Sequence, residues 1–276
     1  MTYKAIVLDL DGTLMTSKNQ IPDKTKNMLI KIQEKGIKVI LASGRPMHGL
    51  LKASKILQLK KYGGYLLAYN GGQIIDMKDD SLIFDSYLDM NTILELYDKS
   101  RLLNTSLLAY NDQSILTEDN DQYIQIESEI NDLVINQVDN FKDALKTTSV
   151  KCLMTGEPTH LANVEIQLKA MYQNQLSISR SMPFFIECMP KGINKGNCLS
   201  ILLKKLNIDK NEVIACGDGY NDISLIEAVG LGVAMGNGCK PVKDKAKYIT
   251  SSNDEDGIVQ VIEKFILNNK KDLRIS

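Results

Sequence analysis

Two aspartates, Asp9 and Asp11, stand one residue apart, directly after the apolar run Ala5–Leu8 and before Gly12. An uninterrupted apolar run predicts a strand buried on both faces, as in a parallel sheet. Both carboxylates then lie just past the carboxyl end of that strand, where open α/β sheets place their chemistry. Because close carboxylates repel each other unless a cation or a shared proton relieves them, the pair indicates a metal-assisted site. A solvated turn is the alternative, whereas an EF-hand loop would need further ligands that the sequence lacks here.

The same pattern recurs after a later apolar run, Val213–Cys216, which is followed by Asp218 and Asp222. Residues four apart share a face if a helix starts here, and the N–H groups of a helix start favour a bound anion. In a parallel sheet, Asp218 can approach Asp9 and Asp11 at one edge. Three carboxylates with water and a phosphate oxygen form a hard oxygen shell suited to Mg²⁺. For Asp222, a capping or salt-bridging role is the alternative.

Two further segments carry groups that could hold a phosphate. Ser43 and Gly44 follow the predicted strand Ile37–Ala42, and a hydroxyl and an N–H at a helix N-terminus can bind phosphate oxygens. An ordinary serine N-cap before Pro46 is the alternative. Lys195 precedes the helix that leads back to the second acidic segment, and there it could balance the carboxylates and hold the phosphate as a point charge.

The elements that position these residues alternate between strand and helix in the first eighty residues. Apolar runs predict strands at Ala5–Leu8, Ile37–Ala42 and Tyr65–Tyr69, with a helix that ends at Gly36 and another from Pro46 onward. This repetition predicts right-handed βαβ units and a parallel sheet. The alternation returns after Asn194, with a helix to Leu206, strands at 213–216, 231–235 and 248–250, and an amphipathic helix over 257–268.

The middle of the chain has a different pattern. A hairpin is predicted around 74–84, followed by helices near 91–103 and 158–172 and strands near 106–110, 150–154, 175–180 and 184–189. Residues 111–149 are polar and weakly patterned. We therefore expect an α/β core formed by residues 1–83 and 188–276, with an α+β domain inserted at 84–187.

Composition narrows the classes of function. The 276 residues are 43% hydrophobic and 24% charged, with a formal net charge of −1, which gives no reason to expect nucleic acid or an anionic membrane as partner. No apolar stretch approaches the ~20 residues that span a bilayer. Since Met1–Lys4 leads directly into the first strand, no signal peptide and a cytoplasmic location are expected. Five scattered cysteines without a C-x-x-C pair, beside two histidines, predict reduced core thiols rather than a zinc site or a catalytic cysteine.

In their order along the chain, these segments resemble the motifs of the haloacid dehalogenase superfamily, and specifically Cof-type phosphatases with a large α/β cap. Asp9–Thr13 resembles the nucleophile motif, Ser43 the second motif, Lys195 the third and Gly217–Asp222 the fourth. Ser43 stands where threonine is commoner and keeps the hydroxyl. The resemblance covers essentially the whole chain and implies a Rossmann-like three-layer core with a mainly parallel sheet and an inserted α+β cap.

The resemblance also implies a role for each motif residue. Asp9 would attack phosphorus to form an aspartyl-phosphate, and Asp11 would protonate the leaving alkoxide and then activate the hydrolytic water. Mg²⁺ would be held by Asp9, by Asp11 through its backbone carbonyl and by Asp218. The phosphoryl oxygens would be held by the Leu10 N–H, Ser43, Gly44, Lys195 and Asn221. Asp222 would orient Lys195 or metal-bound water. Arg45 and Asn70, near the mouth, could orient substrate or serve only as loop residues.

These features predict a Mg²⁺-dependent phosphatase that hydrolyses small phosphorylated metabolites, such as sugar phosphates or phosphorylated cofactors, and whose cap selects the leaving group. A sugar phosphomutase with the same nucleophile is the alternative, but its cap would need many basic residues, and the stretch 104–149 has Lys142 and Lys146. A non-catalytic module that binds phosphate ligands is a third possibility, against which both Asp9 and Asp11 argue. The sequence predicts neither the substrate nor the oligomeric state.

Overall fold

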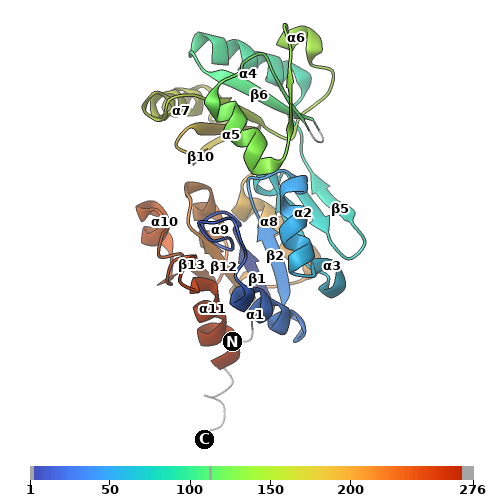
Figure 1. The fold of residues 1–276 in the computed structure, drawn as a ribbon, viewed down its shortest axis with the longest axis vertical. Coiled ribbons are helices and arrows are strands. Elements are labelled where there is room, and N and C mark those ends of the chain that lie inside the picture. The colour runs from blue at the N-terminus through green and yellow to red at the C-terminus, as the bar shows by residue number, and fades with distance from the viewer. Residues whose placement is uncertain (1–2, 112–113, 269–276) are drawn as a thin grey trace, which may run out of the picture.

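A computed structural model describes residues 3–111 and 114–268, and its strands form two separate sheets. The larger sheet lies in the lower half of Figure 1 and contains segments from both ends of the chain. Its strands are β1 (Ala5–Leu8), β2 (Lys38–Ala42), β3 (Tyr65–Ala68), β4 (Gln73–Asp76), β5 (Ser81–Asp85), β12 (Val213–Gly217), β13 (Leu231–Ala234) and β14 (Tyr248–Ile249). They lie in the order β14-β13-β12-β1-β2-β3-β4-β5.

Strand β1 lies inside this sheet and pairs in parallel with β2 on one side and β12 on the other. All four of its side chains are fully buried, as the apolar run predicts. The sheet is parallel from β14 to β3, and the predicted hairpin forms the antiparallel strands β4 and β5 at its edge. The expected mainly parallel sheet is confirmed.

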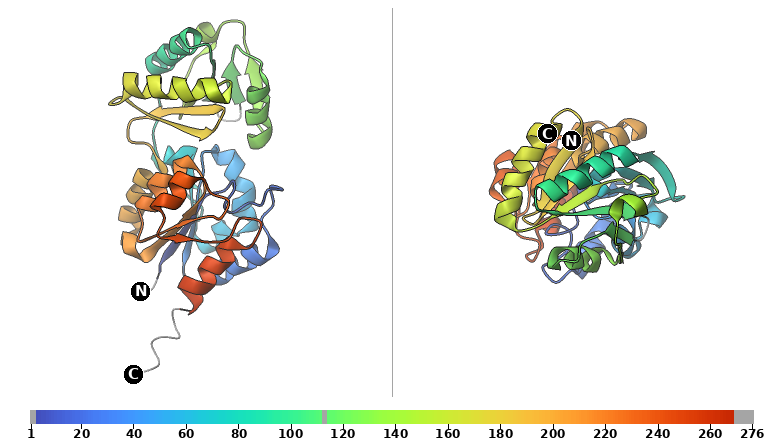
Figure 2. Two further views of the ribbon diagram at one scale, coloured as in Figure 1. Left: turned by 90° about the vertical axis from the view of Figure 1, so that its left-hand side faces the viewer. Right: turned by 90° about the horizontal axis from the view of Figure 1, so that it is seen from above.

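Helices cover both faces of this sheet and complete a three-layer core, as expected (Figure 2). On one face α8 (Lys195–Leu206) packs against α9 (Ile223–Glu227), and on the other α1 (Asp23–Gln33) packs against α11 (Gly257–Val261). The further core helices are α2 (Met47–Ile56), α3 (Leu59–Tyr62) and α10 (Lys240–Lys245). The last predicted helix is α-helical only to Val261 and continues as a π-helical turn over Ile262–Leu267.

The smaller sheet comes from the middle of the chain and lies above the first in Figure 1; we call it, with its helices, the cap. Its strands, in the spatial order β10-β11-β9-β6-β7-β8, are β10 (Leu176–Met182), β11 (Phe185–Pro190), β9 (Cys152–Thr155), β6 (Ser106–Asn111), β7 (Ser114–Thr117) and β8 (Val134–Gln137). The sheet is antiparallel except for the parallel pair β7 and β8. Its helices are α4 (Met90–Leu102), α5 (Gln122–Asn131), α6 (Phe141–Ala144) and α7 (Pro158–Tyr172).

The stretch 111–149 is more ordered than its weak pattern suggests. Apart from residues 112 and 113, which lie outside the described residues, it contains β7, α5, β8 and α6. Helix α5 lies in the lower part of the cap in Figure 1 and contacts α2 of the core. The division of the chain at residues 84 and 187 stays a prediction, and residues 269–276 of its last segment lie outside the described residues.

Within the described ranges, no helix is long and apolar enough to cross a membrane. The five cysteines are free thiols, and all except Cys239 are buried.

Candidate active site

The predicted site residues meet at the carboxyl ends of the parallel strands. Strand β1 leads into Asp9 and Asp11, β2 into Ser43, β3 into Asn70 and β12 into Asp218. The Asp9 N–H still donates to the Cys216 carbonyl at 3.0 Å, so Asp9 extends the pairing of the sheet beyond β1. The aspartates and Ser43 line one cavity of about 350 Å³, and cap residues line its other side.

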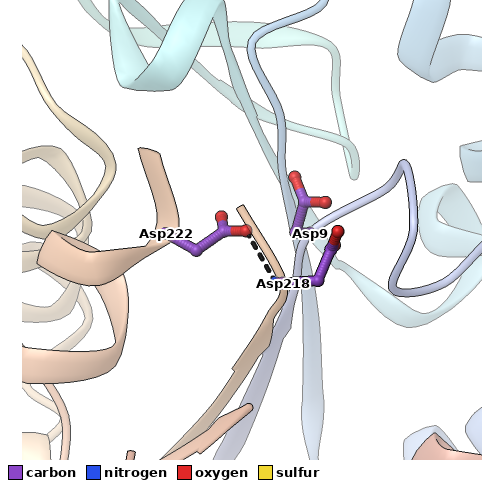
Figure 3. A group of neighbouring side chains, drawn as sticks. All are labelled: Asp9, Asp218 and Asp222. Atoms are coloured by element: carbon purple, nitrogen blue, oxygen red, sulfur yellow. Dashed lines mark hydrogen bonds between the residues drawn. The ribbon is translucent and has the colours of Figure 1, made fainter. Parts of the chain in front are cut away.

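Three carboxylates cluster at the floor of this cavity. Asp9, Asp218 and Asp222 each place one oxygen within 4.8 Å of the others (Figure 3). Asp222 is buried, and its Oδ2 accepts the backbone N–H groups of Asp218 at 3.0 Å and Gly219 at 2.9 Å. This carboxylate is thereby fixed in place by the turn after β12.

Lys195 lies beside this cluster as the first residue of α8. Its fully buried Nζ donates to Asp9 Oδ1 at 2.5 Å and to Asp222 Oδ1 at 2.6 Å. Burial lowers the pKa of Lys195, but Asp222 and Asp9 outweigh burial and raise it overall, so the side chain is charged. One lysine thus faces three acidic groups.

Burial and the neighbouring negative charge both raise carboxyl pKa values in this cluster. Burial and then the nearby Asp222 raise the pKa of Asp9 well above its usual range. The same two causes raise the pKa of Asp218 to about 7. Clustered carboxylates that lack sufficient cationic partners fit a divalent cation, whose charge would relieve the repulsion.

The turn after β1 is shaped around Asp218. Gly12 has φ of +77°, and a Cβ at this position would lie 2.3 Å from Asp218 Oδ2. The Thr13 hydroxyl donates to Asp218 Oδ1 at 2.7 Å. Glycine therefore provides both the left-handed backbone and the room for this carboxylate. Leu10, between the two catalytic candidates Asp9 and Asp11, is fully buried.

Arg45 lies against Asp11. Its Nη2 and Nε donate to the two Asp11 oxygens at 2.5 and 2.8 Å, and its Nη1 donates to the Ile130 carbonyl of cap helix α5 at 2.9 Å. A guanidinium that pairs with a carboxylate through two bonds is well oriented. Beside it, the buried Ser43 Oγ accepts the Arg45 N–H at 3.1 Å, and helix α2 begins only at Met47.

Asn221 and Asn70 are also brought together. Asn221 Nδ2 donates to Asn70 Oδ1 at 3.1 Å, and Asn70 Nδ2 donates to Glu187 of the cap strand β11. Asn70 is buried, with φ of +53°. Its contacts are therefore with other site residues from both the core and the cap.

Sequence reasoning missed the polar residues that the cap contributes. Lys151 Nζ donates to Glu187 Oε1 at 2.8 Å and to the Gly44 carbonyl at 3.0 Å, and Glu127 of α5 accepts the Tyr110 hydroxyl. Lys151 and Glu187 each interrupt an apolar run, Val150–Met154 and Phe184–Met189. A charged residue inside a predicted buried strand is the signal that could have found them.

Residues 6–262 match the family model of haloacid dehalogenase-like hydrolases, and the chain belongs to this family, as the motifs predict. A crystal structure of a haloacid dehalogenase-like hydrolase from Bacteroides thetaiotaomicron is similar, with 41% identity and a TM-score of 0.86, covering 96% of this chain and 100% of that one. "Putative phosphatase M6_Spy0533" of Streptococcus pyogenes serotype M6 is 31% identical, over 97% of this chain and 100% of the relative. The 5-amino-6-(5-phospho-D-ribitylamino)uracil phosphatase YcsE of Bacillus subtilis is 29% identical, over 96% of each chain.

Proposed function

We propose that this protein is a Mg²⁺-dependent phosphatase that hydrolyses small phosphorylated metabolites through an aspartyl-phosphate intermediate. The observation that carries the proposal is the buried Asp9 carboxylate, which lines the cavity beside Lys195, Asp218 and Asp11. Relatives named as phosphatases support this reaction class. Sugar phosphates and phosphorylated cofactors are the substrates that we propose.

In this mechanism Asp9 attacks phosphorus and the ester oxygen leaves with the proton of Asp11. Asp11 then takes a proton from the water that hydrolyses the aspartyl-phosphate. Without substrate, Arg45 pairs with Asp11. A bound phosphoryl group would give the guanidinium of Arg45 a second anion to pair with. Arg45 would thus orient substrate and free Asp11 for proton transfer.

The phosphoryl oxygens would be held by the Leu10 N–H, Ser43, Gly44, Lys195 and Asn221. Lys195 suits this role because its ammonium is already held by two carboxylates at the cavity floor. Asp222, which holds both Lys195 and the turn after β12, positions the lysine.

The residues present fit a hard divalent cation. Asp9 and Asp218 would hold Mg²⁺ through carboxylate oxygens and Asp11 through its backbone carbonyl, an oxygen-only donor set of the kind that Mg²⁺ prefers. When bound, the ion would neutralise charge on the phosphoryl group and align that group with Asp9. Burial, and then the nearby Asp222, raise the pKa of Asp218, and a bound cation would favour its ionised form.

The cap side of the cavity favours hydrolysis over the phosphomutase alternative. Among the cavity-lining residues that the structure describes, the cationic ones are Arg45 and Lys151, and each is paired with a carboxylate. A bisphosphorylated intermediate would need a free cation at the end remote from Asp9. We propose that residues 84–187 form the domain that closes the cavity, excludes water during transfer and selects the leaving group.

Phosphate release from a panel of phosphorylated metabolites and p-nitrophenyl phosphate, with Mg²⁺ or with EDTA, tests this proposal. The panel includes a hexose 1-phosphate and 5-amino-6-(5-phospho-D-ribitylamino)uracil. We expect Mg²⁺-dependent release that Asp9→Asn lowers on the order of 1,000-fold or more, because the nucleophile is lost. Undiminished release by Asp9→Asn would contradict the mechanism, and conversion of the 1-phosphate into a 6-phosphate would identify a mutase.

A further inference from the structure

A chain of buried hydrogen bonds runs from the cap into two loops of the core. Lys151, just before β9, donates from Nζ to the Gly44 carbonyl at 3.0 Å and to Glu187 Oε1 at 2.8 Å. The other oxygen of Glu187 accepts from Asn70 Nδ2, and Asn70 Oδ1 accepts from Asn221 Nδ2 at 3.1 Å. The chain thus ends on two residues, Gly44 and Asn221, that the proposed function places around the phosphoryl group.

The ion pair within this chain is almost free of solvent. The side chains of Lys151 and Glu187 are 3% and 2% exposed. Burial lowers the pKa of Lys151, but Glu187 and Glu127 outweigh it and raise the pKa overall, so the lysine is charged. A buried pair tolerates its desolvation only when its remaining donors and acceptors are satisfied, and here Gly44 and Asn70 satisfy them.

Glu187 also lies where the loops after β2 and β3 meet. A Cβ on Gly44 would lie 3.1 Å from Glu187 Oε1 and 3.5 Å from Asn70 Nδ2, so the three groups are closely packed. Tyr69 and Asn70 are successive non-glycine residues in the left-handed region, with φ of +51° and +53°. Such a conformation persists when the surroundings hold it in place, and Glu187 bonds directly to the second of these residues.

The chemistry of Glu187 fixes the orientation of both amides. An ionised carboxylate only accepts hydrogen bonds, so Asn70 must turn its NH₂ group toward Glu187 and its carbonyl oxygen toward Asn221. Asn221 must then present its own NH₂ group to Asn70. The Asn221 NH₂ group has two N–H bonds, and one of them donates to Asn70. The other remains free to donate to a phosphoryl oxygen.

We propose that Glu187 is a positioning residue of the cap, which orients Asn221 through Asn70 so that the phosphoryl group meets an N–H donor. The inference rests on the proposed function, in which Asn221 binds the phosphoryl oxygens. Through Glu187 the cap contributes to binding the part that all substrates share, in addition to the leaving group.

Glu187 also lines the cavity, so direct contact with the leaving group is the competing explanation. The two explanations differ in how the loss depends on the substrate. With Glu187→Gln, a side-chain amide can donate to Asn70 and allow both asparagines to flip. We expect kcat/KM to fall about 10- to 100-fold, by one common factor for every ester including p-nitrophenyl phosphate. Inhibition by orthovanadate, which has no leaving group, weakens by a similar factor.

A double-mutant cycle tests whether Glu187 acts through Asn221. In the Asn221→Ala background, Glu187→Gln is expected to cost less than about 3-fold, because the side chain that it orients is gone. Glu165→Gln is the matched control, since Glu165 is a cap glutamate paired with Lys169 and Arg180 away from the cavity. This control should leave kcat/KM unchanged.

Losses that differ strongly between esters, or full additivity with Asn221→Ala, would overturn the inference. If Glu187→Gln does not fold, the same measurements are made on the Lys151→Met/Glu187→Met protein. This double variant lacks the carboxylate acceptor but leaves no unpaired buried charge. If the wild-type protein hydrolyses none of the panel, the proposed function fails first. Calorimetric titration with Mg²⁺ and orthovanadate then decides the inference, and equal affinity in wild type and Glu187→Gln overturns it.

Discussion

Asp9, Asp218 and Asp222 cluster beside a single lysine, which pairs with Asp9 and Asp222, and this imbalance of charge governs the chemistry of the cluster. Burial, and then repulsion by Asp222, raise the pKa values of Asp9 and Asp218, so protons and a divalent cation compete for the same oxygens. Stability, metal affinity and pH are therefore linked at this site.

Metal-dependent stabilisation should increase with pH. Without metal, the pKa of Asp218 is raised from 3.8 to about 7, so its contribution to stability is present below about pH 4 and is lost as the pH rises through 7. We expect the free energy of unfolding of the metal-free protein to fall over this range, by at most about 4 kcal/mol from this group. Mg²⁺ should therefore raise Tm more at pH 8 than at pH 5.5, as thermal unfolding with Mg²⁺ or EDTA would measure.

Asp218→Asn is the control for this linkage. It should weaken the stabilisation by Mg²⁺ and reduce the pH dependence of the metal-free protein between pH 4 and 7, to which Asp9 still contributes. An equal Mg²⁺-induced shift in Tm at both pH values in the wild type would contradict the linkage.

Gly12→Ala should disable the site by displacing Asp218. Alanine at φ of +77° costs about 1 kcal/mol or more, and its Cβ would overlap Asp218 Oδ2. We expect kcat/KM to fall at least about 100-fold and Mg²⁺ binding to weaken. Gly36→Ala is the matched control, because Gly36 has φ of +84° and a Cβ added there would have no neighbouring atom within 4 Å. It should lower Tm similarly and leave activity intact; equal activity of the two variants would show that the clash is unimportant.

At the scale of elements, the strands that carry the motifs could be predicted because the strands are buried on both faces. The apolar runs of β1, β2 and β12 record that burial directly. Helix α5 could not be found in this way. Its buried positions are Ile124, Glu127 and Asn131, which have helical spacing, but two of them are polar because they line the cavity. Strand β8 is largely exposed at the edge of the cap sheet, so it lacks an apolar pattern too.

The residues of the site also divide into those whose proximity could be predicted from the sequence and those whose proximity could not. The motif residues could be brought together from the sequence, since the carboxyl ends of parallel strands share one edge of a sheet. The partners of Lys151 could not be predicted from the sequence. Its contact with Gly44 joins residues 107 apart and depends on how the cap lies on the core.

The start of α8 should matter for both stability and catalysis. Asn194 caps this helix by accepting the Asn197 N–H at 2.9 Å, and Lys195 is the next residue. Asn194→Ala should cost about 1 kcal/mol of stability and lower kcat/KM several-fold, because Lys195 would lose its fixed backbone. Asp89→Ala removes the equivalent cap of α4 and should cost similar stability without a change in kcat/KM. Urea unfolding and steady-state kinetics would measure both; a kinetic loss shared by both variants would point to a general effect of destabilisation.

At the scale of the whole molecule, the two sheets meet through polar groups as well as through packing. Arg45 reaches from the core to the Ile130 carbonyl of α5, and Lys151 reaches from the cap to the Gly44 carbonyl. Both bonds join the cap to the loop after β2. The same loop therefore shapes the proposed phosphate site and anchors the cap above it.

The buried Lys151–Glu187 pair should serve the geometry of the site more than the stability of the molecule. Lys151→Met leaves Glu187 charged and unpaired, and should lower the free energy of unfolding by about 3 to 5 kcal/mol. In the Lys151→Met/Glu187→Met protein both charges are gone and the volume is kept, so most of this loss should be recovered. Activity should not return, because neither Gly44 nor Asn70 regains its partner. Urea unfolding beside kcat/KM for p-nitrophenyl phosphate measures the two effects. A double variant as unstable as the sum of the single losses would mean that the pair itself stabilises the fold, whereas recovered activity would mean that the cap needs no polar contact here to organise the site.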